Sequence, residues 1–359
     1  MAYKRLLSFL LIFLFLQQAN AQSADSILNF IANHKENSSL YLKKNDTLIA
    51  SLNENKQMPL ASTCKIMVAV EFAKQAAFHV FDPNSKVALK DLDKYYLPLT
   101  DGNAHPQWIK YEKDQGNIKN DSVSLLNVAR GMIMFSSNAN TEYLMDILGL
   151  DNINGNYRQM GIKNFTPLYY FVSAIMLYQN PKKIKEEKIL KAIKGMSQKD
   201  YIKASDLIHQ QLKNNPAYKN SFHIADLTTN LQKEWSDRLP ASTTESYSRI
   251  AEIINDRQIY NAETYAILSR VLETLMENKN NQQWLDHAGM KGGSTMFVLT
   301  KTLYATLKSG DKIELSYFFN NLQNNEATTL SKSANAFDLA ILSDPAFVKR
   351  LSDLIGLSD

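Results

Sequence analysis

The sequence predicts a mixed α/β fold of the α+β type, in which both ends of the chain build one antiparallel sheet that helices flank. Three observations support this prediction. A hairpin pattern lies near the N-terminus, at residues 39–53, and a second lies near the C-terminus, at residues 296–321. Between them, apolar residues recur mostly at helical spacing. We therefore expect the two hairpins to share a sheet, with a helical body inserted between them.

Length and composition are those of a folded globular protein. The chain has 359 residues, of which 45% are hydrophobic and 21% are charged, which argues against a disordered tail, a fibre or a protein with many membrane spans. Its 40 Lys and Arg face 36 Asp and Glu, and this net charge of +4 is too small to predict a nucleic-acid binder. The single cysteine excludes an internal disulfide framework and a cysteine-rich zinc site.

The first residues have the pattern of a cleaved export signal. Lys4 and Arg5 form a positive start, and residues 6–16 are largely apolar. Ala19 and Ala21 then have the spacing that a signal peptidase needs. The apolar run is too short to span a bilayer comfortably, and no cysteine follows it that could carry a lipid. We therefore expect export to the periplasm or the exterior, cleavage after Ala21, and no stable membrane span afterwards.

The elements of the mature chain, residues 22–359, follow from local patterns. Residues 39–53 hold two short apolar runs around the turn-rich Lys44–Asp46, which indicates a β-hairpin. From Ile66 to Phe78 the apolar residues are too dense for a surface helix, so a buried helix is predicted. Residues 89–122 are polar and contain prolines and glycines, so we expect loops there.

The middle of the chain is predicted to be helical. Residues 124–148 show two helical patterns with a break near residues 135–138. Residues 180–239 are rich in Lys, Gln and Asn and lack a strong core pattern. Their charge run is most simply a solvated helix face, and a membrane or partner surface is the alternative interpretation.

The C-terminal part returns to strands after two more helices. The helices are predicted within residues 242–278. Two strand patterns then meet at Gly310 and Asp311, which is a hairpin signal. A final helix is predicted over residues 336–356. No internal repeat is visible.

The first chemical motif lies at the mouth of the predicted buried helix, where the chain reads Ser62-Thr63-Cys64-Lys65. Residues three apart lie on one helix face, so the Lys65 amine can sit beside the Ser62 hydroxyl. A serine is a weak nucleophile until a base takes its proton, and a lysine is such a base when burial lowers its pKa. The spacing recurs at residues 309–312, in the predicted hairpin turn, where we expect only a structural role. Ser62 alone could equally be a helix N-cap.

Two more short motifs accompany the first. Ser136, Ser137 and Asn138 fall in the break between two predicted helices, where polar side chains can face a cleft. Residues 291–294 read Lys-Gly-Gly-Ser and precede a strand predicted to begin near Phe297. Glycines at a strand edge let a ligand approach the backbone. Each motif alone is best explained as a turn, and only their order and placement together predict a catalytic site.

Together these motifs resemble the signature of the serine β-lactamase and penicillin-binding protein family, which is S-x-x-K, S-D-N and K-T-G. The resemblance covers essentially the whole mature chain. It implies a class A β-lactamase-like fold and a serine hydrolase that breaks a C–N amide bond through an acyl-enzyme. No cofactor and no metal are implied, and the expected partner is a small-molecule β-lactam or a cell-wall peptide.

The resemblance also implies a role for each site residue. Ser62 would be the acylated nucleophile, Lys65 its proton partner, and Ser136 the group that passes a proton to the leaving nitrogen. The substrate-binding residues would be Asn138, Lys291, Gly293 and Ser294. The backbone N–H groups of Ser62 and Ser294 would form the oxyanion hole.

The chain departs from the family pattern in three places. Ser137 stands where the family has Asp, so a carboxylate that would brace the loop is absent. Gly292 stands where the family has Thr or Ser, although Ser294 or Thr295 could replace that hydroxyl. Residues 166–177 contain no counterpart of the E-x-x-L-N glutamate that activates water to release the acyl-enzyme. Glu187, an imperfect match further along the chain, is either a displaced base or part of a solvated helix face.

Two other residue types, histidine and cysteine, could have a role in the site. His287 precedes Lys291 by four residues and could touch the site. The six histidines show no metal-ligand spacing, so no metal site is predicted. Cys64 is expected to be a core residue of the buried helix, with a reactive thiol as the alternative.

The domain boundaries follow from the resemblance. The separation of the second and third motifs exceeds that in compact family members, which predicts an insert at about residues 176–238. The sheet part would comprise about residues 22–60 and 258–359, and the helical part about residues 61–257.

Three functions stay open at this point. The first is a β-lactamase-related hydrolase, slow because it lacks the aligned glutamate. The second is a D-alanyl-D-alanine carboxypeptidase or related amidase, as in penicillin-binding proteins. The third is a weakly catalytic penicillin-recognising or partner-binding module, for which the insert would be the interaction surface. The third is disfavoured because a scaffold has no physical need for the five residues Ser62, Lys65, Ser136, Asn138 and Lys291. The oligomeric state is not predicted.

Overall fold

The sheet joins the two ends of the chain, as the sequence predicts. In the computed structural model, residues 24–215, 217–323 and 325–356 are described, and the predicted signal with its cleavage site lies outside them. The sheet has five antiparallel strands in the order β2-β1-β9-β8-β7. These are β1 (Ser38–Lys44), β2 (Thr47–Leu52), β7 (Leu285–Ser294), β8 (Leu299–Leu307) and β9 (Lys312–Phe319). The N-terminal β1 pairs with the C-terminal β9, which confirms the predicted fold class.

Strand β7 is one element that we did not predict. The sequence predicted only that residues 291–294 precede a strand near Phe297, but residues 285–294 pair with β8 along their length, with Lys291 opposite Thr302. The run Gly289–Gly293 contains no β-branched or aromatic residue, so its intrinsic strand propensity is low. The strand therefore depends on pairing with β8, which local pattern does not reveal.

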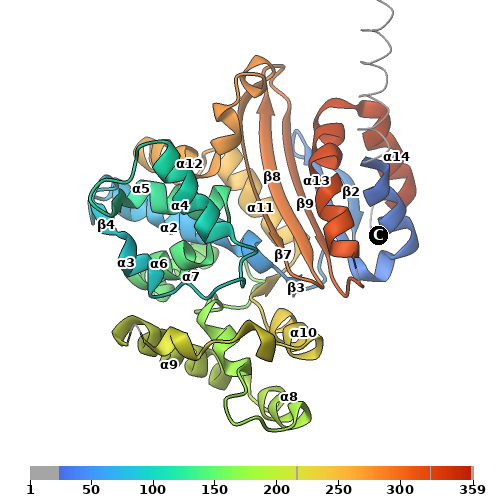
Figure 1. The fold of residues 1–359 in the computed structure, drawn as a ribbon. Coiled ribbons are helices and arrows are strands. Elements are labelled where there is room, and N and C mark those ends of the chain that lie inside the picture. The colour runs from blue at the N-terminus through green and yellow to red at the C-terminus, as the bar shows by residue number, and fades with distance from the viewer. Residues whose placement is uncertain (1–23, 216, 324, 357–359) are drawn as a thin grey trace, which may run out of the picture.

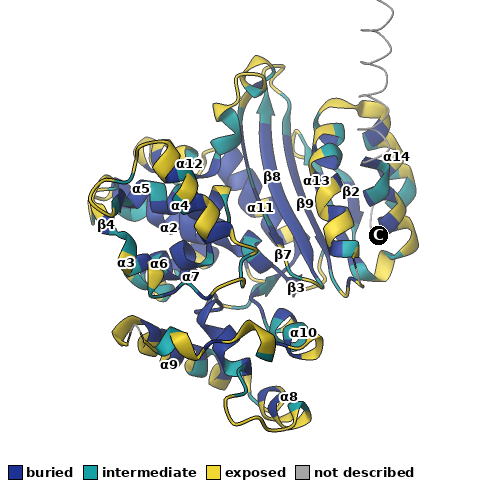
Figure 2. Cartoon of the chain, viewed as in Figure 1, coloured by how far each residue is buried: buried dark blue, intermediate teal, exposed yellow. Residues whose placement is uncertain are grey.

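Each face of the sheet packs against its own set of helices (Figures 1 and 2). On one face Leu303 and Leu315 belong to a core shared with the helix at residues 24–33 and with the last two helices. On the other face Tyr304 and Phe318 belong to the larger core of the helical body. The alternation along β8 and β9 is the period-2 burial of a sheet covered on both sides. The helices next to the sheet are α11 (Thr244–Asn255), α13 (Glu326–Ser343) and α14 (Pro345–Ile355).

The predicted final helix over residues 336–356 is in fact two helices. Helix α13 ends at Ser343, and α14 begins at Pro345. A proline lacks the N–H that would continue the first helix, but it is well suited to the first turn of the next. The Asp344 carboxylate accepts the N–H groups of Ala346 and Phe347, which caps α14.

The predicted buried helix is α2 (Lys65–Ala77), the central helix of the molecule. Nearly all of its residues are buried, in agreement with its dense apolar pattern. Four helices surround it, namely α5 (Leu125–Met134), α6 (Asn138–Leu148), α7 (Leu150–Gln159) and α12 (Ala262–Leu272). The break that the sequence predicts between α5 and α6 is therefore held next to the start of α2.

The prediction of loops over residues 89–122 is wrong in part. This stretch contains α3 (Leu89–Asp93) and α4 (Ala104–Asp114), and it is flanked by the short strands β4 (Lys86–Ala88) and β5 (Ser122–Ser124). Helix α4 is anchored by one fully buried side chain, Trp108, whose Nε1 donates to Glu112. A single large buried residue can anchor a helix, but it does not produce the repeated apolar spacing from which a helix is predicted.

The polar stretch between residues 176 and 238 is mostly helical and contributes buried side chains to the main core. Its helices are α8 (Glu186–Lys194), α9 (Gln198–Asn214) and α10 (Thr229–Asp237), which lie below the helical body in Figure 1. Although its sequence lacks a strong core pattern, Tyr201, Ile208, Leu212 and Leu231 are buried and join the main cluster. None of the helices in the described ranges is long and apolar enough to span a bilayer.

Candidate active site

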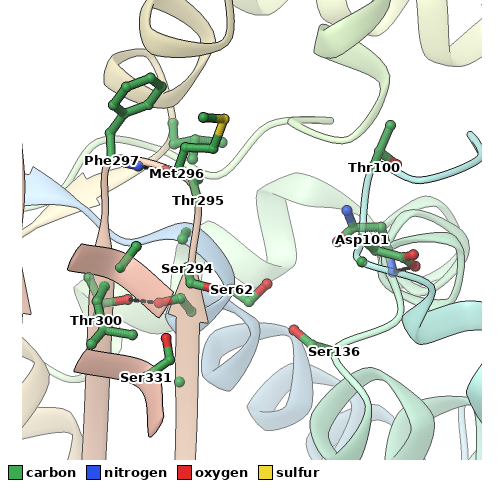
Figure 3. Close-up of a pocket in the computed structure, with 18 of the residues that line it drawn as sticks. Ser62, Thr100, Asp101, Ser136, Ser294, Thr295, Met296, Phe297, Thr300 and Ser331 are labelled. Atoms are coloured by element: carbon green, nitrogen blue, oxygen red, sulfur yellow. Dashed lines mark hydrogen bonds between the residues drawn. The ribbon is translucent and has the colours of Figure 1, made fainter. Parts of the chain in front are cut away.

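The three sequence motifs meet at one cleft of about 780 Å³ (Figure 3). The first motif forms a 3-10 turn, η2 (Ala61–Cys64), that leads into α2. The second is the turn between α5 and α6, and the third is the end of β7. In Figure 3 the hydroxyls of Ser62 and Ser136 face each other across this cleft.

Lys65 is held by the second motif. Its side chain is fully buried, and its Nζ donates to the Ser136 carbonyl at 2.8 Å and to Asn138 Oδ1 at 2.9 Å. The Ser136 hydroxyl lies 3.3 Å from the same Nζ. Burial lowers the pKa of Lys65 to about 8, although the charge of Asp101 opposes the shift. About a tenth of this amine is therefore neutral at pH 7 and able to accept a proton, far more than for an ordinary lysine.

Lys291 reaches the same hydroxyl from the opposite side. Its Nζ donates to Ser136 Oγ at 3.0 Å and to the Gly292 carbonyl at 2.8 Å. Burial, together with the positive charge of Lys65, lowers the pKa of Lys291 well below its usual range. Ser136 thus bridges two amines, and its backbone adopts the left-handed region at a φ of 66°. Such local strain is typical of functional sites.

Gly293 allows β7 to pass directly beside the nucleophile. A Cβ atom at this position would lie 2.3 Å from the Ser62 nitrogen and 2.8 Å from the Leu60 carbonyl oxygen. The Thr300 hydroxyl on β8 reinforces the junction, since it donates to the Leu60 carbonyl at 2.7 Å. Ser62 and Ser294 consequently line the same cleft, which is the arrangement that a shared oxyanion hole needs.

The turn at Ser137 is braced by residues that the sequence did not point to. Ser137 is buried, accepts the N–H of Asn140 and lies 2.9 Å from His105 Nδ1. The Asp101 carboxylate accepts the N–H groups of Asn138 and His105, so a carboxylate from another loop supports the turn. Both residues lie in the stretch that we expected to be loops, where only the helix-capping pattern before α4 could have indicated them.

Two candidate residues are not brought to the cleft. His287 lies on β7, but four residues of strand separate it from Lys291 by about 13 Å, so it does not reach the cleft. Its Nδ1 instead lies 3.3 Å from Glu273 Oε1. Glu187 is exposed on α8 and does not line the cleft. Cys64 is buried with its Sγ 3.0 Å from the Ala61 carbonyl, and burial raises its thiol pKa to about 12, which corresponds to an unreactive core thiol.

The cleft floor opposite the lysines is apolar. It includes Phe171 and Ile175, from the segment where the family places its water-activating glutamate. Among the described residues that line the cleft, Asp101 supplies the one carboxylate. Glu142, the buried carboxylate of α6, does not line the cleft, and its Oε1 is engaged by Ser173 and His209.

His209 joins α9 to α6. Its Nδ1 lies 2.9 Å from Glu142 and its Nε2 3.2 Å from Asp146. Burial alone would lower the pKa of His209, but the two carboxylates outweigh it and raise the pKa to about 9. The ring also stacks between Tyr95 and Tyr170, at centroid distances of 5.0 and 3.6 Å. Helix α9 is therefore ion-paired to the helix that begins at Asn138.

One acidic cluster could in principle hold a metal ion among the described residues. It consists of Asp46, Glu252 and Asp256 and lies outside the cleft. Lys43 pairs with Glu252 at 2.7 Å and Lys312 with Asp256 at 2.5 Å. These lysines already neutralise much of the negative charge that a metal would use.

Comparison with known families decides which group of proteins this site belongs to. A model described as the β-lactamase enzyme family matches residues 22–246, which is more than half of the chain. The chain belongs to the β-lactamase enzyme family. The third motif, residues 291–294, lies beyond the residues that the family model matches. Its assignment rests instead on the close approach of Gly293 to Ser62. No curated protein matches the chain in sequence.

Solved β-lactamase structures share the fold at low sequence identity. A class A β-lactamase from Bacteroides cellulosilyticus is 17% identical, with a TM-score of 0.51 over 93% of this chain and 98% of that one. A β-lactamase from Chitinophaga pinensis is 13% identical, with a TM-score of 0.53 over 90% and 99%. One from Sphaerobacter thermophilus is 13% identical, with a TM-score of 0.54 over 91% and 98%. At these identities the similarity establishes the fold of the β-lactamases and nothing finer.

Proposed function

We propose that Ser62 attacks the carbonyl carbon of a β-lactam, or of a related D-alanyl amide, and forms an acyl-enzyme. The observation that carries this proposal is the bridge of Ser136 between the Lys65 and Lys291 amines, directly across the cleft from Ser62. Buried amines with lowered pKa values can accept and return a proton near neutral pH. The apposed Ser62 and Ser294 provide backbone for an oxyanion site.

The proposed step balances without a cofactor. Neutral Lys65 takes the proton of the Ser62 hydroxyl as Ser62 Oγ bonds to the carbonyl carbon. The C–N bond then breaks with its electron pair on nitrogen. Ser136 donates its proton to that nitrogen and is reprotonated by Lys65. Asn138 and Lys291 would hold the amide and the carboxylate of the substrate.

We propose further that hydrolysis of this acyl-enzyme is slow. The floor of the cleft presents Phe171 and Ile175 where a water-activating carboxylate would be needed, and Asp101 is occupied with backbone N–H groups. The cleft therefore has groups suited to acylation, whereas its one carboxylate among the described residues, Asp101, is already engaged and is not free to activate water for deacylation. A D-alanyl carboxypeptidase or another penicillin-binding protein is the second candidate, because it would need the same acylation groups.

Intact-protein mass after addition of benzylpenicillin tests the proposal. The wild type should gain the mass of one penicillin and keep it for longer than the mixing time, whereas Ser62→Ala should gain none. An unmodified wild type with undiminished penicillin would overturn acylation. Penicillin consumption with only a fleeting adduct would overturn slow hydrolysis. Release of D-alanine from an acetylated peptide ending in D-alanyl-D-alanine would favour the second candidate.

We also propose that the protein is exported and that residues 22–359 form one catalytic domain with an insert at about residues 176–238. The charged start, the short apolar run and the small residues before Gln22 support export. N-terminal sequencing of the mature protein should begin at Gln22. A mature protein that retains Lys4 and Arg5 would contradict cleavage after Ala21.

A further inference from the structure

Positive charge is concentrated in one part of the insert. Residues 181–203 contain eight lysines and three acidic residues, whereas residues 22–359 as a whole contain 38 Lys and Arg against 36 Asp and Glu. The excess positive charge of this one stretch is therefore larger than that of the mature chain, and the rest of the mature chain is slightly acidic. All eight lysines are exposed. Helix α8, which this stretch contains, lies at the lower end of the molecule in Figure 1, away from the sheet.

Five of these lysines lie in the turn before α8 and on α8 itself. Lys188 and Lys191 are one helical turn apart, on the side of α8 that faces away from the buried Ile189 and Ile193. The turn contributes the other three lysines and one exposed apolar side chain. We call this surface the basic tip, and it comprises Lys182, Lys183, Ile184, Lys185, Lys188 and Lys191.

The turn before α8 has a defined conformation. Asn180 Oδ1 accepts the Ile184 N–H at 2.9 Å, and Asn180 Nδ2 donates to the Ile184 carbonyl at 2.8 Å. Lys183 adopts the left-handed region at a φ of 46°, which is uncommon for a residue other than glycine. The backbone of Ile184 is thus hydrogen-bonded within the turn, while its side chain is 43% exposed. An ordered turn therefore presents an apolar side chain to water among lysines.

The positive charge of the basic tip is not neutralised by its neighbours. Within the part of the chain that the structure describes, none of its five lysines makes an ion pair, whereas Lys194 at the end of α8 lies 3.8 Å from Glu234. Glu186 is engaged by Asn230, whose Nδ2 donates to it at 2.8 Å, so Glu187 is the acidic residue left beside these lysines. Like charges three residues apart destabilise a helix slightly, so the arrangement does not serve the stability of α8.

The chemistry of the basic tip favours a membrane surface over a nucleic acid or a small anion. Residues 181–203 contain no arginine that could grip one phosphate with two N–H groups, and the basic tip has no aromatic side chain on which a base could stack. None of its residues lines the active-site cleft, so a small anion would not be enclosed there. Lysine amines act as point charges that suit a layer of anionic headgroups, and an apolar side chain among them can enter that layer.

We propose that the basic tip docks the protein on a membrane surface that carries anionic phospholipids. The lysines are attracted to the headgroups, and Ile184 buries its side chain at the boundary between headgroups and acyl chains. The association is peripheral, since the described ranges hold no helix that could cross a bilayer. The inference does not depend on the proposed acylation, because the basic tip lies outside the cleft.

Co-sedimentation with lipid vesicles tests the proposal. The mature protein is mixed with vesicles of phosphatidylglycerol and phosphatidylcholine, and separately with vesicles of phosphatidylcholine alone. It should bind the first and not the second, and about 0.5 M NaCl should release it, because salt screens exposed charges. No binding to the anionic vesicles, or equal binding to both kinds, would overturn the proposal.

A triple variant assigns the binding to the basic tip. Combining Lys182→Gln, Lys183→Gln and Lys185→Gln should lower the partition coefficient on anionic vesicles about a hundredfold, because each lysine near an anionic surface contributes about fivefold. The three side chains are exposed and make no ion pair in the described ranges, so the urea midpoint of unfolding should stay that of the wild type. Undiminished binding by a folded triple variant would contradict the proposal.

The matched control removes the same charge from another part of the surface. Lys279, Lys308 and Lys332 are exposed, lie outside the insert and the cleft, and have no ion pair within the described part of the chain. Replacing all three by Gln should change vesicle binding much less than the triple variant of the basic tip does. Equal losses in the two triple variants would show that net charge alone drives the binding, which would overturn docking through the basic tip.

Ile184→Ser separates a membrane from a soluble polyanion. It should weaken binding to anionic vesicles severalfold, because an apolar side chain that leaves water stabilises the bound state, and it should leave binding to soluble polyphosphate unchanged. The exposure of Ile184 makes a folding defect unlikely to accompany this change, and the urea midpoint checks it. If the wild type binds polyphosphate as tightly as vesicles and Ile184→Ser alters neither, the basic tip recognises polyanions in general and the membrane proposal is overturned.

Discussion

The two sides of the cleft are built from different chemistry. On the side of α2 and β7, Lys65 and Lys291 are buried and each lies within 3.3 Å of the Ser136 hydroxyl. On another side, Phe171 and Ile175 present apolar surface, and Glu142 does not line the cleft. The groups that we propose to move a proton during acylation are therefore concentrated on one side, and among the described residues the apolar side supplies no carboxylate for hydrolysis. In the proposed function, forming an acyl-enzyme and releasing it are separable tasks within one cleft.

The largest effect on acylation is expected when the proposed base, Lys65, is removed. Lys65→Met should lower the acylation rate constant by about a thousandfold, as expected for loss of a general base. In the wild type the rate constant should rise about tenfold per pH unit and level off above pH 8, because only the neutral amine accepts a proton and the pKa of Lys65 is lowered to about 8. Acylation followed by mass from pH 6 to 10 measures both effects, and a flat profile in the wild type would exclude Lys65 as the base.

The ion pairs of His209, which join α9 to α6, should contribute to the stability of the folded protein. The pKa of His209 is raised from 6.5 to about 9, so its stabilising contribution is complete below pH 6.5 and is lost as pH rises through 9. That contribution amounts to about 3 kcal/mol. His209→Gln should therefore unfold at lower urea concentration than the wild type at low pH, and the difference should shrink at high pH. A difference that does not change with pH would contradict the ion-paired junction.

Because β7 passes so close to Ser62, one added methyl group at Gly293 should slow acylation. Gly293→Ala should slow acylation by about a hundredfold, because its Cβ would displace the Ser62 backbone and shifts of about 1 Å cost that much. Gly292→Ala is the matched control, since its Cβ would make only ordinary contacts, with the Thr300 carbonyl oxygen at 3.4 Å and with Lys301 Cγ at 3.8 Å. Acylation rates of the two variants that fall together would show that the close approach at Gly293 is not required.

The smallest expected effect concerns the brace on the acylation side. Asp101→Asn should slow acylation by about tenfold or less, since it weakens one hydrogen bond to the Asn138 backbone. Loss of its negative charge should also move the midpoint of the pH profile down, because Asp101 raises the pKa of Lys65. Asp114→Asn, at the exposed end of α4, is the control. An unchanged midpoint would limit Asp101 to a structural role.

Local patterns predicted the elements whose stability depends on their own residues. The hairpin turns near Asn45 and Gly310, the dense apolar run of α2 and the break before Asn138 all match the structure. Strand β7, helix α4 and the core of the insert were missed because their stabilising partners are distant in the chain. In the insert, Tyr201, Ile208 and Leu212 share one face of α9, but intervening Lys and Gln dilute the pattern.

For the site, helix spacing placed Lys65 beside Ser62. The resemblance of the three motifs to the family signature then pointed to Ser136, Asn138 and Lys291. Asp101 and His105 could not be found in this way, since they act through backbone N–H groups and a hydroxyl far along the chain. The apolar floor and the contact of Glu142 with His209 likewise exist only once distant segments pack together. Short motifs and their order therefore predicted which residues meet at the cleft, whereas long-range packing determined their pKa values, their support and the shape of the cleft that surrounds them.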